Sequence, residues 1–297
     1  MANKSRAADG MVSYLGVADS FRPASNRYRK YLYLIGLFAL LVIMLFPFAL
    51  ITINAFKTEA EYSSRGPLTL PESLYTADII SYWNRVHFDV KLVNSTVISL
   101  AVAILGVVLS LLNAFALGIG RVKGRIWFLV FFMIAIMLPQ ESLAYPLYYF
   151  AKLLKIYDTQ FSVIVVFSVL QSAFGTYLLS SVFSEFPREI IESAWIDGCN
   201  KLQLLLRIVV PISMPSLLVL FTFFFIWTWN EFFLPLILLI SDAKQTVPIA
   251  VALNQSQYQM TVTTQSASAL LGVLPCVLFF VLFQRTLTRG ITAGSIK

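Results

Sequence analysis

The chain has 297 residues, of which 58% are hydrophobic and only 12% charged, and its mean hydropathy is +0.78. An ordinary soluble domain is about one quarter charged, so this composition excludes a soluble globular protein of this length. The net charge is +7 at neutral pH. Whether this charge indicates a nucleic-acid partner or contact with membrane lipid depends on where the basic residues lie along the chain.

Six apolar segments follow one another along the chain and predict six membrane-spanning helices. Three stretches, 31–56, 92–120 and 159–184, contain no Asp, Glu, Lys or Arg. Each exceeds the roughly 20 residues that a helix needs to cross a bilayer. The predicted spans are 31–55, 92–118, 126–150, 159–184, 209–240 and 266–285. The predicted fold class is an all-α polytopic membrane protein, with a tail over 1–30 and one domain over 31–297.

The basic residues are distributed unevenly between the two sides of the predicted membrane. With the N-terminus in the cytoplasm, 15 of the 22 Lys and Arg residues fall in cytoplasmic segments and 7 in external ones. The positive-inside rule therefore predicts that the N- and C-termini are both cytoplasmic. Basic residues beside anionic membrane lipid account for the net charge, so we expect no nucleic-acid partner.

The sequence carries no motif for nucleotide chemistry or metal binding. A phosphate-binding loop needs the dipeptide Gly-Lys, which does not occur. The chain has one histidine, His87, and two widely separated cysteines, Cys199 and Cys276. We therefore expect no enzyme activity, no cofactor and no metal site in this chain.

The longest predicted cytoplasmic loop, residues 185–208, has the pattern of two helices joined by a glycine. Pro187 suits the first turn of a helix over 188–197, and Gly198 suits the left-handed position that ends it. A second helix is predicted from about residue 201 to 210, before Pro211. On this pattern alone, two interpretations remain open: a helix that docks into a partner's groove, or one that lies on the bilayer surface.

The spacing within this loop resembles the EAA loop of ABC importer permeases, which reads E-A-A, three residues, G, nine residues and I-x-L-P. The matching positions are Glu192, Ser193, Ala194, Gly198, Ile208 and Pro211. Ser193 replaces the Ala usual at the second position of E-A-A, and Val210 replaces the usual Leu, both mild departures. The loop lies between the fourth and fifth spans on the predicted cytoplasmic side, as the family pattern requires.

Further segments resemble the carbohydrate-uptake permeases related to the maltose system, over roughly residues 30–297. They are Leu138-Pro139, Pro146-Leu147, Trp229-Asn230-Glu231-Phe232, Pro235-Leu236, Gln284-Arg285 and Arg289-Gly290-Ile291-Thr292-Ala293-Gly294. The tail before residue 30 has no counterpart in this resemblance.

The resemblance implies a multi-pass permease subunit of a bacterial ABC importer in the cytoplasmic (inner) membrane, translocating a sugar of the di- or oligosaccharide class by alternating access. The implied partners are a second permease subunit forming a heterodimer, two copies of a cytoplasmic ABC ATPase that bind ATP and Mg, an extracytoplasmic solute-binding protein, and membrane lipid. The residues implied in coupling to the ATPases are Glu192, Ser193, Ala194, Trp195, Asp197, Gly198, Ile208 and Pro211. Trp195 also suits an interfacial membrane anchor.

Two other transport functions remain as alternatives. One is an ABC permease for a non-sugar solute, such as a glycerol-phosphate compound or an amino acid. The more distant one is a secondary transporter, for which six spans are half the usual number and the EAA-like loop has no role.

Polar and aromatic residues inside the predicted spans are candidates for the solute pathway, because burying polar groups in lipid is costly. These candidates are Asn113, Gln140, Glu141, Tyr145, Gln171, Trp227, Asn230 and Glu231. The competing interpretation is that they hold helices together. Glu231 is predicted deep in the fifth span, facing the subunit interface or the pathway.

Overall fold

The computed structural model describes residues 27–120, 122–257 and 261–293, so most of the predicted tail lies outside the described residues. Across this part of the chain the regular structure is helical throughout, which confirms the all-α class. The long helices are α2 (Arg27–Ala55), α5 (Phe88–Gly118), α8 (Gln160–Ser184), α11 (Val210–Asn230) and α14 (Val262–Ala293). The shorter ones are α3 (Glu59–Arg65), α4 (Ala77–Arg85), α6 (Arg125–Met137), α7 (Ala144–Leu153), α9 (Arg188–Ile196), α10 (Lys201–Leu204), α12 (Phe233–Leu238) and α13 (Val247–Gln257).

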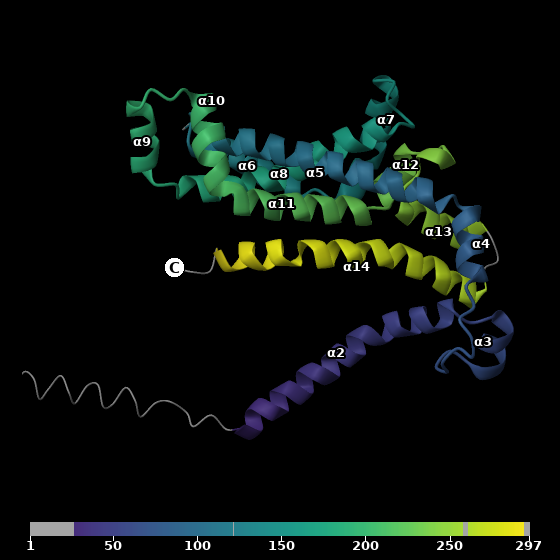
Figure 1. The fold of residues 1–297 in the computed structure, drawn as a ribbon. Coiled ribbons are helices and arrows are strands. Elements are labelled where there is room, and N and C mark those ends of the chain that lie inside the picture. The colour runs from purple at the N-terminus through teal and green to yellow at the C-terminus, as the bar shows by residue number, and fades with distance from the viewer. Residues whose placement is uncertain (1–26, 121, 258–260, 294–297) are drawn as a thin grey trace, which may run out of the picture.

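Among the described residues, five helices are long and apolar enough to cross a membrane. They are Lys30–Ala55, Phe88–Gly118, Gln160–Ser184, Lys201–Asn230 and Val262–Gln284. The long helices run lengthwise through the molecule, with α9 at one end and α3, α4 and α13 at the other (Figure 1). Five of the six predicted spans therefore correspond to unbroken helices long enough to span.

The third predicted span is not one straight helix. The sequence predicted a single element over 126–150, whereas α6 ends at Met137 and a new helical segment, Gln140–Leu153, leaves it at an angle of 94°. Leu138 and Pro139 between them are extended, with ψ of 127° and 125°. Proline lacks the N–H that would continue the helix and disfavours helical backbone in the residue before it, so Pro139 accounts for the break.

The fifth predicted span also ends earlier than the sequence predicted. Instead of continuing to residue 240, α11 ends at Asn230 and Glu231 is extended, with ψ of 130°. The ring of Pro235 in α12 would collide with the carbonyl of residue 231 in a continuous helix. Glu231 therefore lies at a helix end, half-buried, and its Oε1 accepts a hydrogen bond of 3.1 Å from the Phe233 N–H.

The core of the bundle forms where α5, α8 and α11 meet. Small residues allow the close approach that helices need in a membrane. A Cβ atom added to Gly175 of α8 would lie 2.1 Å from Ser110 Oγ on α5, and the buried Phe224 ring of α11 reaches the same place. Asn113 Nδ2 of α5 donates 3.3 Å to Thr176 Oγ1 of α8. These contacts fix the spacing of the helices.

The first span, α2, lies largely apart from this bundle. It contacts α14, and Figure 1 shows it diverging from α14 toward its N-terminal end. Residues 30–49 are all exposed, whereas Asn54 and Ala55 near the other end are buried. Because α2 is apolar on all sides, it presents a long apolar surface along most of its length.

Charged side chains hold the connections at the end of the bundle opposite α9. Lys91, only 1% exposed, donates to the backbone oxygen of Asp242 and pairs with its Oδ2 at 2.8 Å. Asp158 accepts a 2.9 Å hydrogen bond from the Ser241 N–H, another from the Ser241 hydroxyl, and a 3.0 Å contact from Lys244 Nζ. These hydrogen bonds, those from Ser241 foremost, hold the pKa of the Asp158 carboxyl well below its usual range.

Candidate functional site

The first candidate site is α9 together with the turn that follows it. Pro187 lies at the helix start, α9 runs over Arg188–Ile196, and Gly198 has φ of +76°. Asn200 then begins α10 with a reciprocal capping pair: its Oδ1 accepts from the Gln203 N–H at 2.8 Å, and Gln203 Oε1 accepts from the Asn200 N–H at 2.9 Å. The predicted helix–glycine–helix is confirmed as local structure.

The sequence predicted that the second helix of this site ends before Pro211. In the structure this helix continues past Pro211. It passes through a π-helical stretch, Leu205–Val209, and continues directly into α11. Pro211 has no N–H to bond back along the helix, and a π-helical turn is one way to accommodate such an interruption. As a result α10, the π-helical stretch and α11 form one rod that begins at the turn after α9.

The two faces of α9 differ sharply in exposure. Ala194 is 3% exposed and belongs to the buried core that also contains Leu204 and Leu205. On the other face, Trp195 is 54% and Ile196 86% exposed. The small size of Ala194 therefore serves the packing of α9 on its own chain, while two large apolar side chains remain uncovered.

The remaining predicted coupling residues differ in exposure. Glu192, Asp197 and Pro211 are exposed, and Ile208 is half-buried. Ser193 is exposed and its hydroxyl donates 2.7 Å to the Glu189 carbonyl of the same helix.

An open groove lies between α9 and the C-terminal end of α5. Its volume is about 440 Å³, and its lining residues are Ile119, Arg188, Ile191, Glu192, Trp195 and Ile196. Two of these lining residues, Ile119 and Arg188, were not singled out from the sequence. An Ile after a span and an Arg at the start of a helix are common in any membrane protein, so neither gave an indication of a site.

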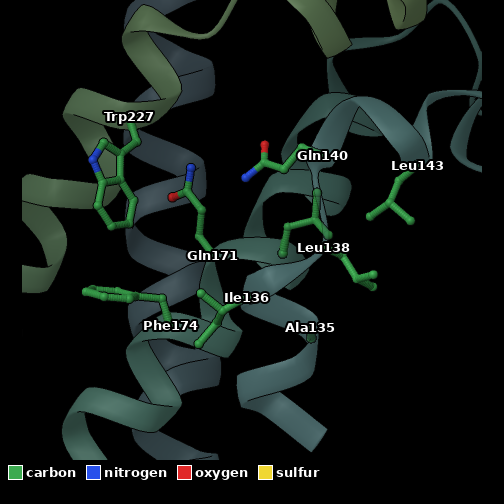
Figure 2. A pocket seen from close by; sticks show the side chains of 9 residues that line it. Ala135, Ile136, Leu138, Gln140, Leu143, Gln171, Phe174 and Trp227 are labelled. Carbon is green, nitrogen blue, oxygen red and sulfur yellow. The ribbon is translucent and has the colours of Figure 1, made fainter.

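The second candidate site is a cavity of about 260 Å³ where the α6–α7 break meets α8 and α11. Its lining residues are Ala135, Ile136, Leu138, Gln140, Leu143, Leu170, Gln171, Phe174 and Trp227. Three of the eight predicted pathway residues meet here: Gln140, Gln171 and Trp227. In the close-up view the Gln171 amide lies between the Trp227 ring and the Gln140 amide (Figure 2).

Gln171 is the most constrained polar group of the cavity, because it is 5% exposed. Its Nε2 donates 2.9 Å to Thr228 Oγ1 of α11, and its Oε1 has no hydrogen-bond partner among the described residues. Trp227 packs edge-on against Phe174 at 5.1 Å between ring centroids. Thr228 and Phe174 were not among the predicted residues, since neither type is distinctive inside an apolar helix.

The other five pathway candidates lie elsewhere. Asn113 bonds to Thr176, and Glu231 accepts from the Phe233 N–H at the start of α12, as described above. Asn230 Nδ2 donates 2.8 Å to the Ile226 carbonyl of its own helix. Glu141 is exposed at the α6–α7 break, and Tyr145 is 76% exposed at the start of α7. The structure therefore does not gather the eight residues into one site.

The described helices, five of them long and apolar enough to cross a membrane, have a counterpart among solved structures. A crystal structure of a bacterial ABC transporter involved in the import of the acidic polysaccharide alginate contains a chain of the same fold. The TM-score is 0.72 and the sequence identity 21%, covering 89% of this chain and 98% of the other.

The family follows from the sequence comparisons. A model of the binding-protein-dependent transport system inner membrane component matches residues 106–293, more than half of the chain. The inner membrane ABC transporter permease protein YcjP of Escherichia coli is 31% identical over 88% of this chain and 94% of its own length. The diacetylchitobiose uptake system permease protein DasC of Streptomyces coelicolor is 28% identical over 86% of this chain and 92% of its own length. The chain belongs to the family of inner-membrane components of binding-protein-dependent ABC transport systems.

Proposed function

We propose that this chain is the permease subunit of an ATP-driven importer that moves a di- or oligosaccharide across the inner membrane by alternating access. Family membership supports the transport function. The saccharide class is supported by relatives such as the diacetylchitobiose permease and by the amide-and-tryptophan cavity between α8 and α11.

In this proposal both termini and α9 lie in the cytoplasm. The excess of Lys and Arg in the corresponding segments, 15 against 7, supports that orientation. So does the alternating course of the spans, which places the start of α2, α9 and the end of α14 toward one end of the molecule (Figure 1). The opposite end, with α3, α4 and α13, then faces the solute-binding protein.

The observation that carries the proposal is the uncovered apolar surface of α9. Trp195 and Ile196 are mostly exposed on a short helix that projects from the end of the bundle, beside the exposed charges of Arg188 and Glu192. A short amphipathic helix of this kind suits a groove on a partner protein. We assign that groove to a cytoplasmic ATPase, two copies of which bind ATP and Mg.

The connection between α9 and α11 gives docking a mechanical consequence. Gly198 at φ of +76° and the capped start of α10 fix the angle between α9 and the rod that continues into α11. Movement of the ATPase against α9 would therefore tilt α11, which lines the cavity through Trp227. Rigid-body rocking of this kind is a recurrent form of domain motion. A second permease subunit completes the pathway and covers α2.

The experiment is an affinity pull-down of tagged chain from native membranes, followed by mass spectrometry. Gly198→Pro removes the positive φ, which proline cannot adopt, and Glu192→Lys reverses a charge on the docking face. Gly124→Pro is the matched control, because Gly124 also has a positive φ of 78° with open space around its Cβ position, in the turn between α5 and α6.

We expect the wild type and Gly124→Pro to retain both an ABC ATPase and a second permease. Gly198→Pro and Glu192→Lys should lose the ATPase and keep the second permease. Recovery of the wild-type chain alone, or of undiminished ATPase with both α9 variants, would show that α9 is not the dock. The surface-helix interpretation would then account for α9.

A further inference from the structure

The rod that begins at the turn after α9 does not reach the external end of the molecule. It runs over Lys201–Asn230, and α12 begins only after the extended residue Glu231. The backbone hydrogen bonds that stiffen a helix are missing at such a break, so a tilt of α11 is not passed on along its own chain. Movement of α12 together with α11 therefore needs another connection.

The helix α5 is continuous between the two ends of the bundle. Its 31 residues make it about 46 Å long at a rise of about 1.5 Å per residue. Figure 1 shows α5 running along the bundle, and Ile119, directly after it, lines the groove beside α9. A Cβ added to Gly106 would lie 2.9 Å from Phe224 Cδ2 of α11, and one added to Gly118 would lie 2.7 Å from Phe183 Cβ of α8. Contacts this close make α5 move together with α8 and α11.

At its external end α5 holds the segment 240–247, which connects α12 to α13. Lys91 is 1% exposed, pairs with Asp242 Oδ2 at 2.8 Å and also donates to the Asp242 backbone oxygen. Ser95 is buried, and its Oγ accepts a 2.8 Å hydrogen bond from the Val247 N–H. A buried charge that loses its partner is strongly destabilising, so separating this segment from α5 is costly.

Asn94 joins three elements at the centre of this contact. Its Nδ2 donates 2.9 Å hydrogen bonds to the carbonyl oxygens of Ala243 and Gln245. Its Oδ1 accepts a 2.7 Å hydrogen bond from Gln160 Nε2 at the start of α8. The side chain is 7% exposed, and its amide group and its carbonyl oxygen are both used. Asn94 therefore fixes the segment against α5 and α8 together.

The outer parts of the two broken spans pack on the same two unbroken helices. A second buried apolar cluster joins α5, α7, α8 and α12, and its members include Ile98, Val102, Ala151, Phe167, Leu234 and Leu238. Bending at Pro139 or Glu231 would pull α7 or α12 away from this cluster and lose its packing contacts. The packing therefore opposes bending at the two breaks.

We propose that α5 transmits movement of the docking groove to the external end, and that Lys91, Asn94 and Ser95 are the positioning residues that attach segment 240–247 to it. The helix α12 and the start of α13 then follow α5, and the break at Glu231 does not bend during transport. Rigid elements in direct contact are a physical route for such coupling. This inference rests on the proposed docking of an ATPase at α9, and it adds the route by which movement reaches the side that faces the solute-binding protein.

The test uses the complete chain with the partners that co-purify with it, in lipid nanodiscs. The parent chain carries a bimane fluorophore on Ile240→Cys, an exposed position at the start of the segment, and has serine in place of Cys199 and Cys276. Asn94→Leu removes the three hydrogen bonds at similar side-chain size. Asn54→Leu is the matched control, because Asn54 is also buried at the external end of a span and its Oδ1 has no partner among the described residues.

Trapping the complex with ATP, Mg and vanadate should change the bimane emission in the parent chain and in Asn54→Leu. In Asn94→Leu this change should fall by about fivefold or more, the lower end of couplings between distant sites. ATP hydrolysis should stay at the parent rate, because the ATPase still docks at α9. Unfolding would lower both quantities, so loss of the response alone separates transmission from stability.

A charge exchange tests Lys91 in the same assay. Lys91→Asp brings two carboxylates together and should abolish the response, and adding Asp242→Lys should restore most of it, because opposite charges meet again. An unchanged response in Asn94→Leu, a parent chain that hydrolyses ATP with no response at Ile240→Cys, or a double exchange no better than Lys91→Asp would each overturn the inference.

Hydrogen exchange on the chain alone tests the attachment without any partner. In Asn94→Leu the backbone amides of residues 241–247 should exchange about tenfold faster, the effect of one lost hydrogen bond, and those of residues 213–229 should not change. Equal exchange of 241–247 in both chains would refute the attachment. A chain that captures no ATPase refutes the proposed function, while this measurement still decides the attachment. A chain that captures an active ATPase without a response of the fluorophore refutes only the route through α5.

Discussion

Replacing Gly175 by Ala tests whether the close contact between α5 and α8 sets the packing of the bundle. The added Cβ would lie 2.1 Å from Ser110 Oγ, 2.7 Å from Ser110 Cβ and 2.9 Å from Phe224 Cζ. Overpacking of a well-packed core costs about 1–3 kcal/mol, and contacts this short place the cost near 3 kcal/mol. The gain in helix propensity from Gly to Ala offsets about 1 kcal/mol of it. A net loss of about 2 kcal/mol remains.

The thermal unfolding midpoint of purified protein in detergent, followed by intrinsic fluorescence, measures this loss. For a chain of this size, about 2 kcal/mol corresponds to a fall of roughly 4 °C. Gly36→Ala in α2 is the control, because a Cβ there meets nothing within 4 Å, and its midpoint should stay level or rise.

A compensating change separates steric overlap from other causes. Ser110→Gly removes both Ser110 atoms that meet the new Cβ, so the double variant should be more stable than the sum of the two single effects by about 1 kcal/mol or more. A Gly175→Ala variant as stable as Gly36→Ala, or a double variant that is merely additive, would refute the packing argument.

Two further predictions concern the end of the bundle opposite α9. The pKa of the Asp158 carboxyl is lowered by its hydrogen bonds, those from Ser241 first, so its contribution to stability is complete above the ordinary Asp value of about 3.9 and is lost as the pH falls further. Asp158→Asn should therefore lower the thermal midpoint at pH 7, and the difference from wild type should narrow below about pH 4; a difference independent of pH would contradict this. Lys91→Ala removes a buried ammonium paired with Asp242 at 2.8 Å and should cost about 1.5–3 kcal/mol, the range for hydrogen bonds to charged groups. The exposed Lys123→Ala should leave the midpoint unchanged, and equal effects of the two Lys variants would show that the Lys91 contact is not stabilising.

The break in the third span shows where the sequence gives a partial signal. Pro139 is visible in the sequence, and a proline inside an apolar run is a candidate for an interruption, although Pro47, Pro215 and Pro275 lie inside continuous helices. The 94° angle between the two halves depends on what each half packs against. The span predicted over 126–150 did not include the break for this reason. Glu231 was expected inside a continuous helix, whereas α11 ends at Asn230, five residues before Pro235.

The candidate pathway shows a second reason for incomplete prediction. Polar residues inside apolar helices were correctly recognised as unusual, but the sequence could not separate those that bond within the bundle, such as Asn113, from those that line a cavity, such as Gln171. The spanning helices are apolar on nearly all sides, so hydrophobic periodicity does not indicate which face packs inward. Nothing in the sequence indicated that Thr228 and Phe174 lie at the cavity, because Thr and Phe are common inside apolar helices.

The sequence by itself determined the properties that depend on neighbouring residues: the apolar length of the spans, the distribution of charge between their connections, and the helix–glycine–helix centred on Gly198. Bilayer thickness and local backbone preferences govern these features directly. Only the tertiary structure decided that Ala194 is buried while Trp195 is exposed, and that Gln140, Gln171 and Trp227 from three separate segments line one cavity. Those relations depend on how the helices rotate and pack against one another, which is set by contacts between residues far apart in the chain.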